Sequence, residues 1–171
     1  MSEVLSRISV NQMTSQIKQM LAVLESQDLL PVVQLAHKKM QKAGVTPVLS
    51  EVEAVTALKQ YYALPILEAP CQQFAISAVV DEYWHWHVLD TRAWRDFCNV
   101  TYGKMMHHVP LDPDNIQEFE RVRALYKETR EMLVLHFGDQ VNEKAYPEIK
   151  GDGKDVVICT FDYCVTSQLF D

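Results

Sequence analysis

Residues 80–92 bring together side chains that commonly bind metal ions or transfer protons. The segment reads VDEYWHWHVLDTR, and the eleven residues that start at Asp81 contain two histidines, two tryptophans and three carboxylates. Imidazole nitrogen and carboxylate oxygen are good ligands for Zn²⁺, Fe²⁺ and Mn²⁺. The sequence therefore predicts a divalent metal site, with zinc, iron or manganese as the ion.

The spacing of Asp81 and His85 suits such a site if the segment is helical. Residues four apart share one face of a helix, so the two side chains can hold one cation, or the carboxylate can fix the tautomer of the imidazole. His87 then falls on the other side of the helix, near Asp90. If the backbone opens into an extended turn instead, both histidines reach one face. Both arrangements are open at the level of sequence.

A third ligand can come from the pair His107-His108, which a loop containing Gly103 could bring back over the helix. We expect the side chains of Trp84 and Trp94 to line the site. The predicted metal ligands are Asp81, His85, His87 and His108, with His87 as the alternative or supporting imidazole.

Two functions follow from these residues. The first is metal-assisted hydrolysis, because a metal-bound water of lowered pKa can act as the nucleophile; a redox reaction at iron is the next choice. The second is a non-catalytic interaction or adaptor protein, in which the histidines, carboxylates and tryptophans form a structural polar network. No GxSxG, Walker A or GxGxxG motif occurs, which disfavours elbow-type hydrolases and P-loop enzymes.

Composition favours one globular domain, and its net charge gives no reason to expect nucleic-acid binding. The chain has 171 residues, of which 48% are hydrophobic and 23% are charged, and its formal net charge is −7. Such a chain can bury a real core. From the acidic net charge we do not expect sequence-independent binding to phosphate backbones, although a local basic patch is still compatible with the sequence.

The cysteines and the hydropathy pattern predict a cytoplasmic protein that does not enter a membrane. The N-terminus lacks the basic region and apolar run of a secretory signal, and no stretch approaches the roughly 18 consecutive apolar residues of a membrane span. Cys71, Cys98, Cys159 and Cys164 show no CxxC spacing, so we expect inert thiols. A Cys159–Cys164 bridge and Cys98 as a metal ligand are the alternatives.

Apolar residues at three- and four-residue steps predict that the fold is all-α. A capping box, Ser50 with Glu53, marks one helix start, and Asp112-Pro113 marks another. We expect a loop over Asn99–Pro110. The predicted helices cover residues 10–24, 29–42, 50–64, 72–98 and 112–138.

The C-terminal part differs in kind from the rest. Residues 156–161 read VVICTF, a β-favouring run with no obvious sheet to join. We therefore predict a helical domain over 1–138, with a compact bundle of helices, and an irregular or β-like extension over 139–171. Residues 150–171 could bind a protein partner, or a second copy of the chain, by strand addition.

The central segment also resembles the glycine-rich domain-containing protein-like family. The resemblance covers at most residues 50–138, and its specific part is the run from Val80 to Pro110, with Trp-His-x-His, Asp90-Thr91, Cys98, Gly103 and a histidine before proline. The chain departs from the pattern at Trp94 and at residues 111–113, and it lacks a glycine-rich tail. The resemblance implies a helical domain with a shared polar site made of Asp81, His85, His87, Asp90, Cys98 and His108.

Overall fold

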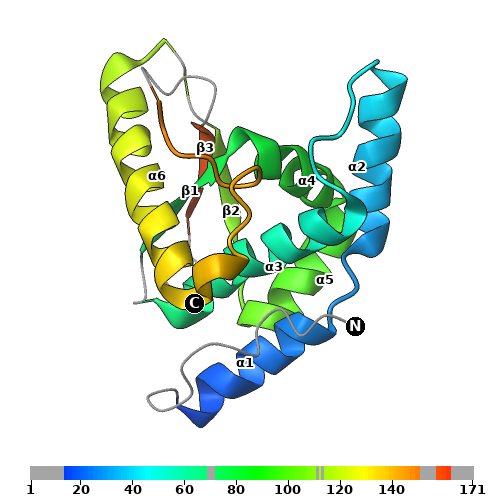
Figure 1. Cartoon of the computed structure of the whole chain (residues 1–171). Helices are drawn as coiled ribbons and strands as arrows, with labels where there is room; N and C mark the ends of the chain where they lie inside the picture. Colours follow the sequence, from blue (N-terminus) through cyan, green and yellow to red (C-terminus); the bar gives the residue numbers. More distant parts are fainter. Residues whose placement is uncertain (1–13, 69–71, 111, 113, 151–156, 163–171) are drawn as a thin grey trace.

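Helices form most of the described chain, and one small sheet joins them. The computed structural model describes residues 14–68, 72–110, 112, 114–150 and 157–162, and at 108–110 and 157–162 it describes the backbone. The elements, coloured along the chain in Figure 1, are α1 (Ser15–Ser26), α2 (Leu30–Lys42), α3 (Glu51–Leu67), β1 (Gln73–Ser77), α4 (Ala78–Leu89), α5 (Thr91–Tyr102), β2 (His107–Pro110), α6 (Ile116–Phe137), a 3₁₀ turn (Gly138–Gln140) and β3 (Val157–Asp162).

The first two predicted helices are confirmed. α1 begins after Thr14, whose hydroxyl accepts a hydrogen bond from the Ile17 amide at 3.3 Å. Residues 10–13 of that prediction lie outside the described residues. α2 matches its predicted range to within one residue, and the chain leaves it through Gly44, whose φ of 76° is disfavoured for a residue with a Cβ.

α3 begins with the predicted capping box. The Ser50 hydroxyl accepts from the Glu53 amide at 3.3 Å, and the Glu53 carboxylate accepts from the Ser50 amide at 2.8 Å. The helix was expected to end before Pro65, but it continues to Leu67. Residues 57–66 are all buried, and α3 contacts α1, α2, α4 and α6. Tertiary packing therefore outweighs the hydrogen bond that Pro65 cannot donate.

The prediction of one long helix over 72–98 is wrong. The structure divides this stretch into β1, α4 and the first part of α5. Ser77 ends the strand and caps α4, and Asp90 ends α4 and caps α5 by accepting a hydrogen bond from the Ala93 amide at 3.1 Å. The strand forms because a partner strand, far along the chain, satisfies its backbone groups.

The C-terminal strand is the centre of a three-stranded antiparallel sheet in the order β1-β3-β2. Thr160 of β3 lies opposite Ala75 on one side and opposite Val109 on the other. The β-like segment is thus confirmed, but the expectation that it finds no sheet in its own chain is wrong. The predicted loop over 99–110 is also wrong in part, because it contains the end of α5 and all of β2.

The predicted fold class, a compact helical protein with a β-like C-terminal segment, is confirmed. Figure 1 shows α3 between α2 on one side and the sheet with α6 on the other, and α6 contacts both β1 and β3. Within the described part of the chain, no helix has the length and apolar character needed to cross a bilayer.

The residues that follow α6 pack into the main core. Val141, Ala145 and Tyr146 are buried with the helices. The Tyr146 hydroxyl donates to the Ala57 carbonyl of α3 at 2.6 Å. This contact fixes residues 141–146 against the centre of the molecule, so the start of the predicted extension is part of the same core. The domain boundary at 138 stays a prediction.

Candidate functional site

The short helix α4 carries most of the residues that the sequence singles out, and Ser77 fixes its start. The Ser77 hydroxyl accepts a hydrogen bond from the Val80 amide at 3.1 Å and donates one to the Ala145 carbonyl at 2.5 Å. Since Ser77 is fully buried, the beginning of α4 is held rigidly against the core. The side chains of α4 therefore project from a fixed support.

His85 and His87 lie on different sides of α4. The helix is continuous from Ala78 to Leu89, so residues two apart point in nearly opposite directions. His85 is exposed, whereas only 3% of the His87 surface is exposed. The helical one of the two arrangements considered above therefore applies, and the two imidazoles do not meet at one ion.

Asp81 lies one turn before His85 and is 9% exposed. The side chain of His108 is outside the described part of the structure, so its predicted contact with Asp81 and His85 stays a prediction. His107 belongs to β2 and is exposed. Within the described residues, no group of three or more His, Cys, Asp and Glu side chains is arranged to hold a metal ion.

Tyr62 is the main partner of His87. Its hydroxyl oxygen lies 2.8 Å from Nδ1 of the imidazole, and Tyr62 itself is fully buried in α3. Burial raises the pKa of Tyr62 well above the usual value for a phenol, with a smaller effect from nearby Cys98. The phenol therefore keeps its proton and is available as a hydrogen-bond donor.

Aromatic rings surround the other faces of the imidazole. The centroid of the His87 ring lies 5.0 Å from that of Trp94 and 4.8 Å from that of Phe97, both in edge-to-face geometry. Burial lowers the pKa of His87 to about 4, although Asp90 acts in the opposite direction. His87 is therefore neutral near pH 7.

The hydrogen bond from Tyr62 determines the tautomer of His87. A buried hydroxyl hydrogen without an acceptor is costly, so Tyr62 donates and Nδ1 accepts. The ring proton of the neutral imidazole then resides on Nε2. Among the described residues no hydrogen bond involves Nε2 of His87. An N–H donor is thus left for a further partner.

His87 lines one wall of a cavity of about 460 Å³, which we call the His87 pocket. This volume falls in the range of sites that hold small molecules. Most of the wall is apolar and comes from the start of α2, the end of α4 and from α5. Its lining residues are Gln27, Asp28, Leu29, Pro31, Val32, Leu35, Trp86, His87, Asp90, Ala93, Asp96, Phe97 and Val100.

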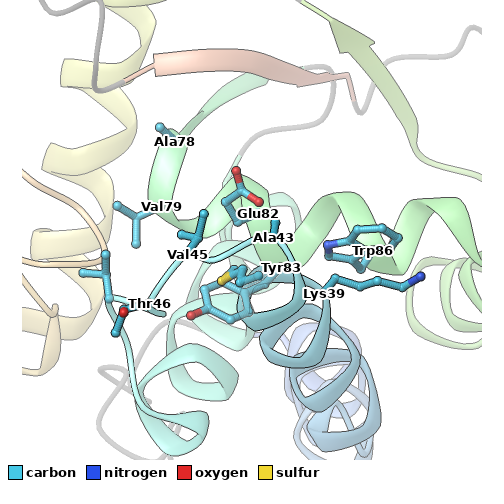
Figure 2. A pocket seen from close by; sticks show the side chains of 11 residues that line it. Lys39, Ala43, Val45, Thr46, Ala78, Val79, Glu82, Tyr83 and Trp86 are labelled. Carbon is cyan, nitrogen blue, oxygen red and sulfur yellow. The ribbon is translucent and has the colours of Figure 1, made fainter.

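A second cavity, of about 400 Å³, lies against another face of α4 and is called the Tyr83 pocket here. In Figure 2, Trp86 and Lys39 lie at one end of it and Thr46 at the other. The Lys39 ammonium lies 5.2 Å from the centroid of the Trp86 ring. The lining residues are Lys39, Met40, Ala43, Val45, Thr46, Val48, Ala78, Val79, Glu82, Tyr83 and Trp86.

The two pockets differ in their polar groups. In the Tyr83 pocket, the buried hydroxyl already has a partner, because it lies 3.1 Å from Nε2 of His37. The charges of Lys39 and Glu82 have opposite signs. The His87 pocket instead combines three carboxylates with an imidazole N–H that has no partner among the described residues. We therefore take the His87 pocket as the candidate site.

Tyr62 is the residue of this site that sequence reasoning missed. A signal was present, because Tyr61 and Tyr62 are adjacent in a largely apolar helix, so at least one of the two hydroxyls would be buried and need a partner. Tyr61 donates to the Phe74 carbonyl at 3.1 Å, while Tyr62 meets His87. The sequence does not indicate which group each hydroxyl would find.

Cys98 lies close to this site but is buried and free. Burial raises the pKa of its thiol to about 12, against a smaller opposing effect of a hydrogen bond from the Met106 backbone. The thiolate, which is the form that binds metals or attacks electrophiles, is therefore scarce near pH 7. This environment matches the predicted inert thiol. The other three cysteine side chains lie outside the described residues.

Comparison with known families gives a match that covers the part of the chain that contains the site. A family model described as UCP032817-like matches residues 21–125, more than half of the chain. The chain belongs to this family. The matched range runs from α1 into α6 and contains every lining residue of both pockets. Comparisons with curated proteins and with solved structures give no match.

Membership of the UCP032817-like family overturns the resemblance to the glycine-rich domain-containing protein-like family. Three residues of the short pattern have local structural roles instead. Asp90 caps α5, Cys98 is buried in the core, and Gly103 ends α5 with a φ of 72°. Asp at a helix start and Gly after a helix end are common for structural reasons, so these parts of the pattern are weakly specific. The polar residues of α4 have to be judged by their own geometry.

Proposed function

We propose that the protein binds a small organic molecule in the His87 pocket, with His87 as the polar anchor. The observation that carries this proposal is the state of the imidazole. It is almost completely buried, it is neutral near pH 7, and Nε2 has no hydrogen-bond partner among the described residues, although the ring lines a cavity. The described residues leave this donor unpaired in a ring that lines a cavity, so a ligand atom in the cavity can accept its hydrogen bond.

The surrounding residues supply the remaining features of a binding site. Tyr62 holds the imidazole in one tautomer and one orientation, so Nε2 offers a directional donor without a charge. Leu29, Val32 and Phe97 give apolar surface that an organic group can cover. Burial of such surface provides affinity, and the single buried donor provides orientation.

Binding is favoured over acid–base catalysis by the same hydrogen bond. A general base must present a lone pair to the substrate, and the lone pair of neutral His87 is on Nδ1, where Tyr62 occupies it. A pKa of about 4 also makes His87 a weak base near pH 7. The proposal therefore assigns a binding role to His87 and no reaction.

A fragment screen on the isotope-labelled full chain tests this function. We expect fragments with a hydrogen-bond acceptor on an aromatic or aliphatic body to shift the imidazole resonances of His87 and the amides of Leu29 and Ala93. The variant His87→Gln should lose this response, whereas His85→Gln, on the exposed face of the same helix, should keep it. A library that leaves these resonances unchanged would overturn the proposal and favour a structural polar network.

A divalent metal ion bound by Asp81, His85 and His108 is a second proposal, with zinc, iron or manganese as the ion. It is supported by the single turn of helix that separates Asp81 from His85. Elemental analysis of protein prepared without a histidine tag should then give near-stoichiometric metal. His85→Ala should lose the metal and His37→Gln should keep it. Folded protein that holds no metal, and takes up none of the three ions, would rule the site out.

Location and partners complete the proposal. A cytoplasmic location fits a buried thiol at Cys98, because free thiols persist in a reducing compartment. A partner that binds through residues 150–171 would have to use residues beyond β3, since both edges of β3 are paired inside the chain. Removal of residues 163–171 should then abolish partner capture or self-association. An unchanged association state in the shortened chain would contradict this role.

A further inference from the structure

From the charges around the His87 pocket, we infer that its ligand is a protonated organic amine with an apolar body and a hydrogen-bond acceptor. This inference rests on the proposed binding function and specifies the class of ligand. It concerns charge and shape together, because the cavity has a buried neutral donor, apolar walls and acidic residues at its exposed parts.

The charges that line the cavity all have one sign. Asp28, Asp90 and Asp96 contribute carboxylates, and all three side chains are exposed to solvent, whereas His87 is buried. Among the described residues, neither lysine nor arginine lines this cavity. The Tyr83 pocket differs, because it contains both Lys39 and Glu82. A cation is therefore the complementary ligand charge at the His87 pocket.

The carboxylates are held in place but not neutralised. Asp28 accepts a hydrogen bond from the Leu30 amide through Oδ1 at 3.1 Å, and Asp90 accepts one from the Ala93 amide in the same way. Each lies at the start of a helix, where the dipole offsets about half an elementary charge. In the described structure, Oδ2 of both residues has no hydrogen-bond partner and remains available to an ammonium group.

Asp96 contributes less to this preference. Its Oδ1 accepts hydrogen bonds from Arg95 at 2.9 and 3.1 Å, and both side chains are more than half exposed. The exposed ion pair weakens the local field of Asp96. Asp28 and Asp90 are therefore the residues expected to attract the cation.

The geometry then orders the parts of the ligand along the cavity. The acceptor atom meets Nε2 of His87 in the buried wall. The apolar body lies against residues such as Val32 and Phe97, and the ammonium group lies at the exposed end near Asp28 and Asp90. An anionic molecule of the same shape would place its charge against these carboxylates.

Three probes that share one phenol ring test the inference on the full-length chain. Tyramine carries an ammonium group, tyrosol replaces it with a neutral hydroxyl, and 3-(4-hydroxyphenyl)propanoate carries a carboxylate. Titration followed by calorimetry and by the His87 resonances should give the tightest binding for tyramine. Tyrosol should bind roughly tenfold more weakly, which corresponds to about 1.4 kcal/mol, and the anion should not bind.

Matched variants separate the charge from the cavity. Asp28→Asn with Asp90→Asn removes both charges but keeps a side-chain oxygen that can accept the hydrogen bonds from the Leu30 and Ala93 amides, and asparagine is also a good cap at the start of α5. This double variant should bind tyramine about as weakly as tyrosol and leave tyrosol unchanged, whereas Glu131→Gln on the surface of α6 should bind tyramine normally. Added salt should weaken tyramine binding alone.

The outcomes distinguish the two proposals. Equal binding of tyramine and tyrosol, or tighter binding of the anion, would overturn the amine assignment and leave the binding function intact. If none of the three probes shifts the His87 resonances, the amine class is also wrong. The binding function itself fails only if the wider fragment screen gives no response at His87.

Discussion

The hydroxyl of Tyr62 lies 2.8 Å from Nδ1 of His87, and both side chains are almost completely buried. This hydrogen bond joins α3 to α4 at the centre of the molecule. It satisfies Nδ1 of the imidazole, and the described residues offer no partner to Nε2 of this ring, which lines the His87 pocket. The tautomer of His87 depends on this hydrogen bond, and the acid sensitivity of the fold depends on the burial of the same imidazole.

The stability of the protein should fall at acid pH because of His87. The imidazole takes up a proton near pH 6.5 in the unfolded chain, but its pKa is about 4 in the folded protein. As the pH falls through this window the unfolded state binds more protons, so the free energy of unfolding falls with it. The loss between about pH 7 and about pH 4.5 should be roughly 2 kcal/mol from this residue.

Urea unfolding of wild type and His87→Gln at the two pH values measures this contribution. Carboxylates also titrate in the window, so the difference between the two proteins is the relevant quantity. The variant should lose less stability on acidification than wild type. His85→Gln, at an exposed position of α4, should behave like wild type. The same acid loss in wild type and His87→Gln would show that His87 is not neutral and buried in solution.

Replacing Tyr62 with phenylalanine should change the tautomer of His87. Nδ1 loses its donor, so the imidazole no longer has a reason to keep its proton on Nε2. Nitrogen-15 spectra should show the Nε2–H form in wild type and a different tautomer balance in Tyr62→Phe. Because Nδ1 of the buried His87 then lacks a hydrogen-bond donor, the free energy of unfolding should also fall by about 1–3 kcal/mol.

Tyr102→Phe is the matched control for this change. Its hydroxyl donates to the Tyr62 carbonyl at 2.9 Å, so the variant loses a buried hydrogen bond in the same region without touching the imidazole. It should be destabilised with an unchanged His87 tautomer. If the nitrogen-15 spectra of Tyr62→Phe match those of wild type, the hydrogen bond from Tyr62 does not determine the tautomer of His87.

The fold was predictable where local sequence decides the structure. The capping box at Ser50 and the glycine after α2 mark true helix boundaries, because the hydrogen bonds involved are made within a few residues. β1 was missed because its backbone partners belong to β3, more than eighty residues later. The predicted helix end before Pro65 was wrong for a related reason, because the packing of α3 against its neighbours outweighs the local preference of proline to end a helix.

The candidate site was predictable in its residue types but not in its pairing. The segment 80–92 does line both cavities, through Glu82 and Tyr83 on one side and His87 on the other. The sequence left open whether His85 and His87 share one face, and the continuous helix α4 places them apart. The sequence could not indicate that the partner of His87 would be Tyr62, because that contact arises from the packing of two helices.

The central position of β3 makes its backbone essential. Thr160 pairs with strands on both sides, and proline at this position cannot donate the amide hydrogen bond. Thr160→Pro should therefore remove amide exchange protection from Gln73–Ser77, whereas Thr160→Val, which keeps the N–H and the β-branched shape, should retain it. Protection in β1 that survives the proline would mean that β3 is dispensable for the sheet.

Arg130 holds residues 143–148 against α6, and its replacement should lower the free energy of unfolding more than the replacement of an exposed ion-pairing residue. It donates to the Tyr146 carbonyl at 3.0 Å and reaches both carboxylate oxygens of Glu143 at 2.7 and 2.8 Å, and its side chain is 18% exposed. Lysine cannot reproduce this forked geometry, so Arg130→Lys should lower the free energy of unfolding by about 1–2 kcal/mol. Arg95→Lys provides the comparison, because the Arg95–Asp96 pair is exposed and should cost less than about 0.5 kcal/mol. Equal effects of the two substitutions in urea unfolding would mean that the segment is not held through Arg130.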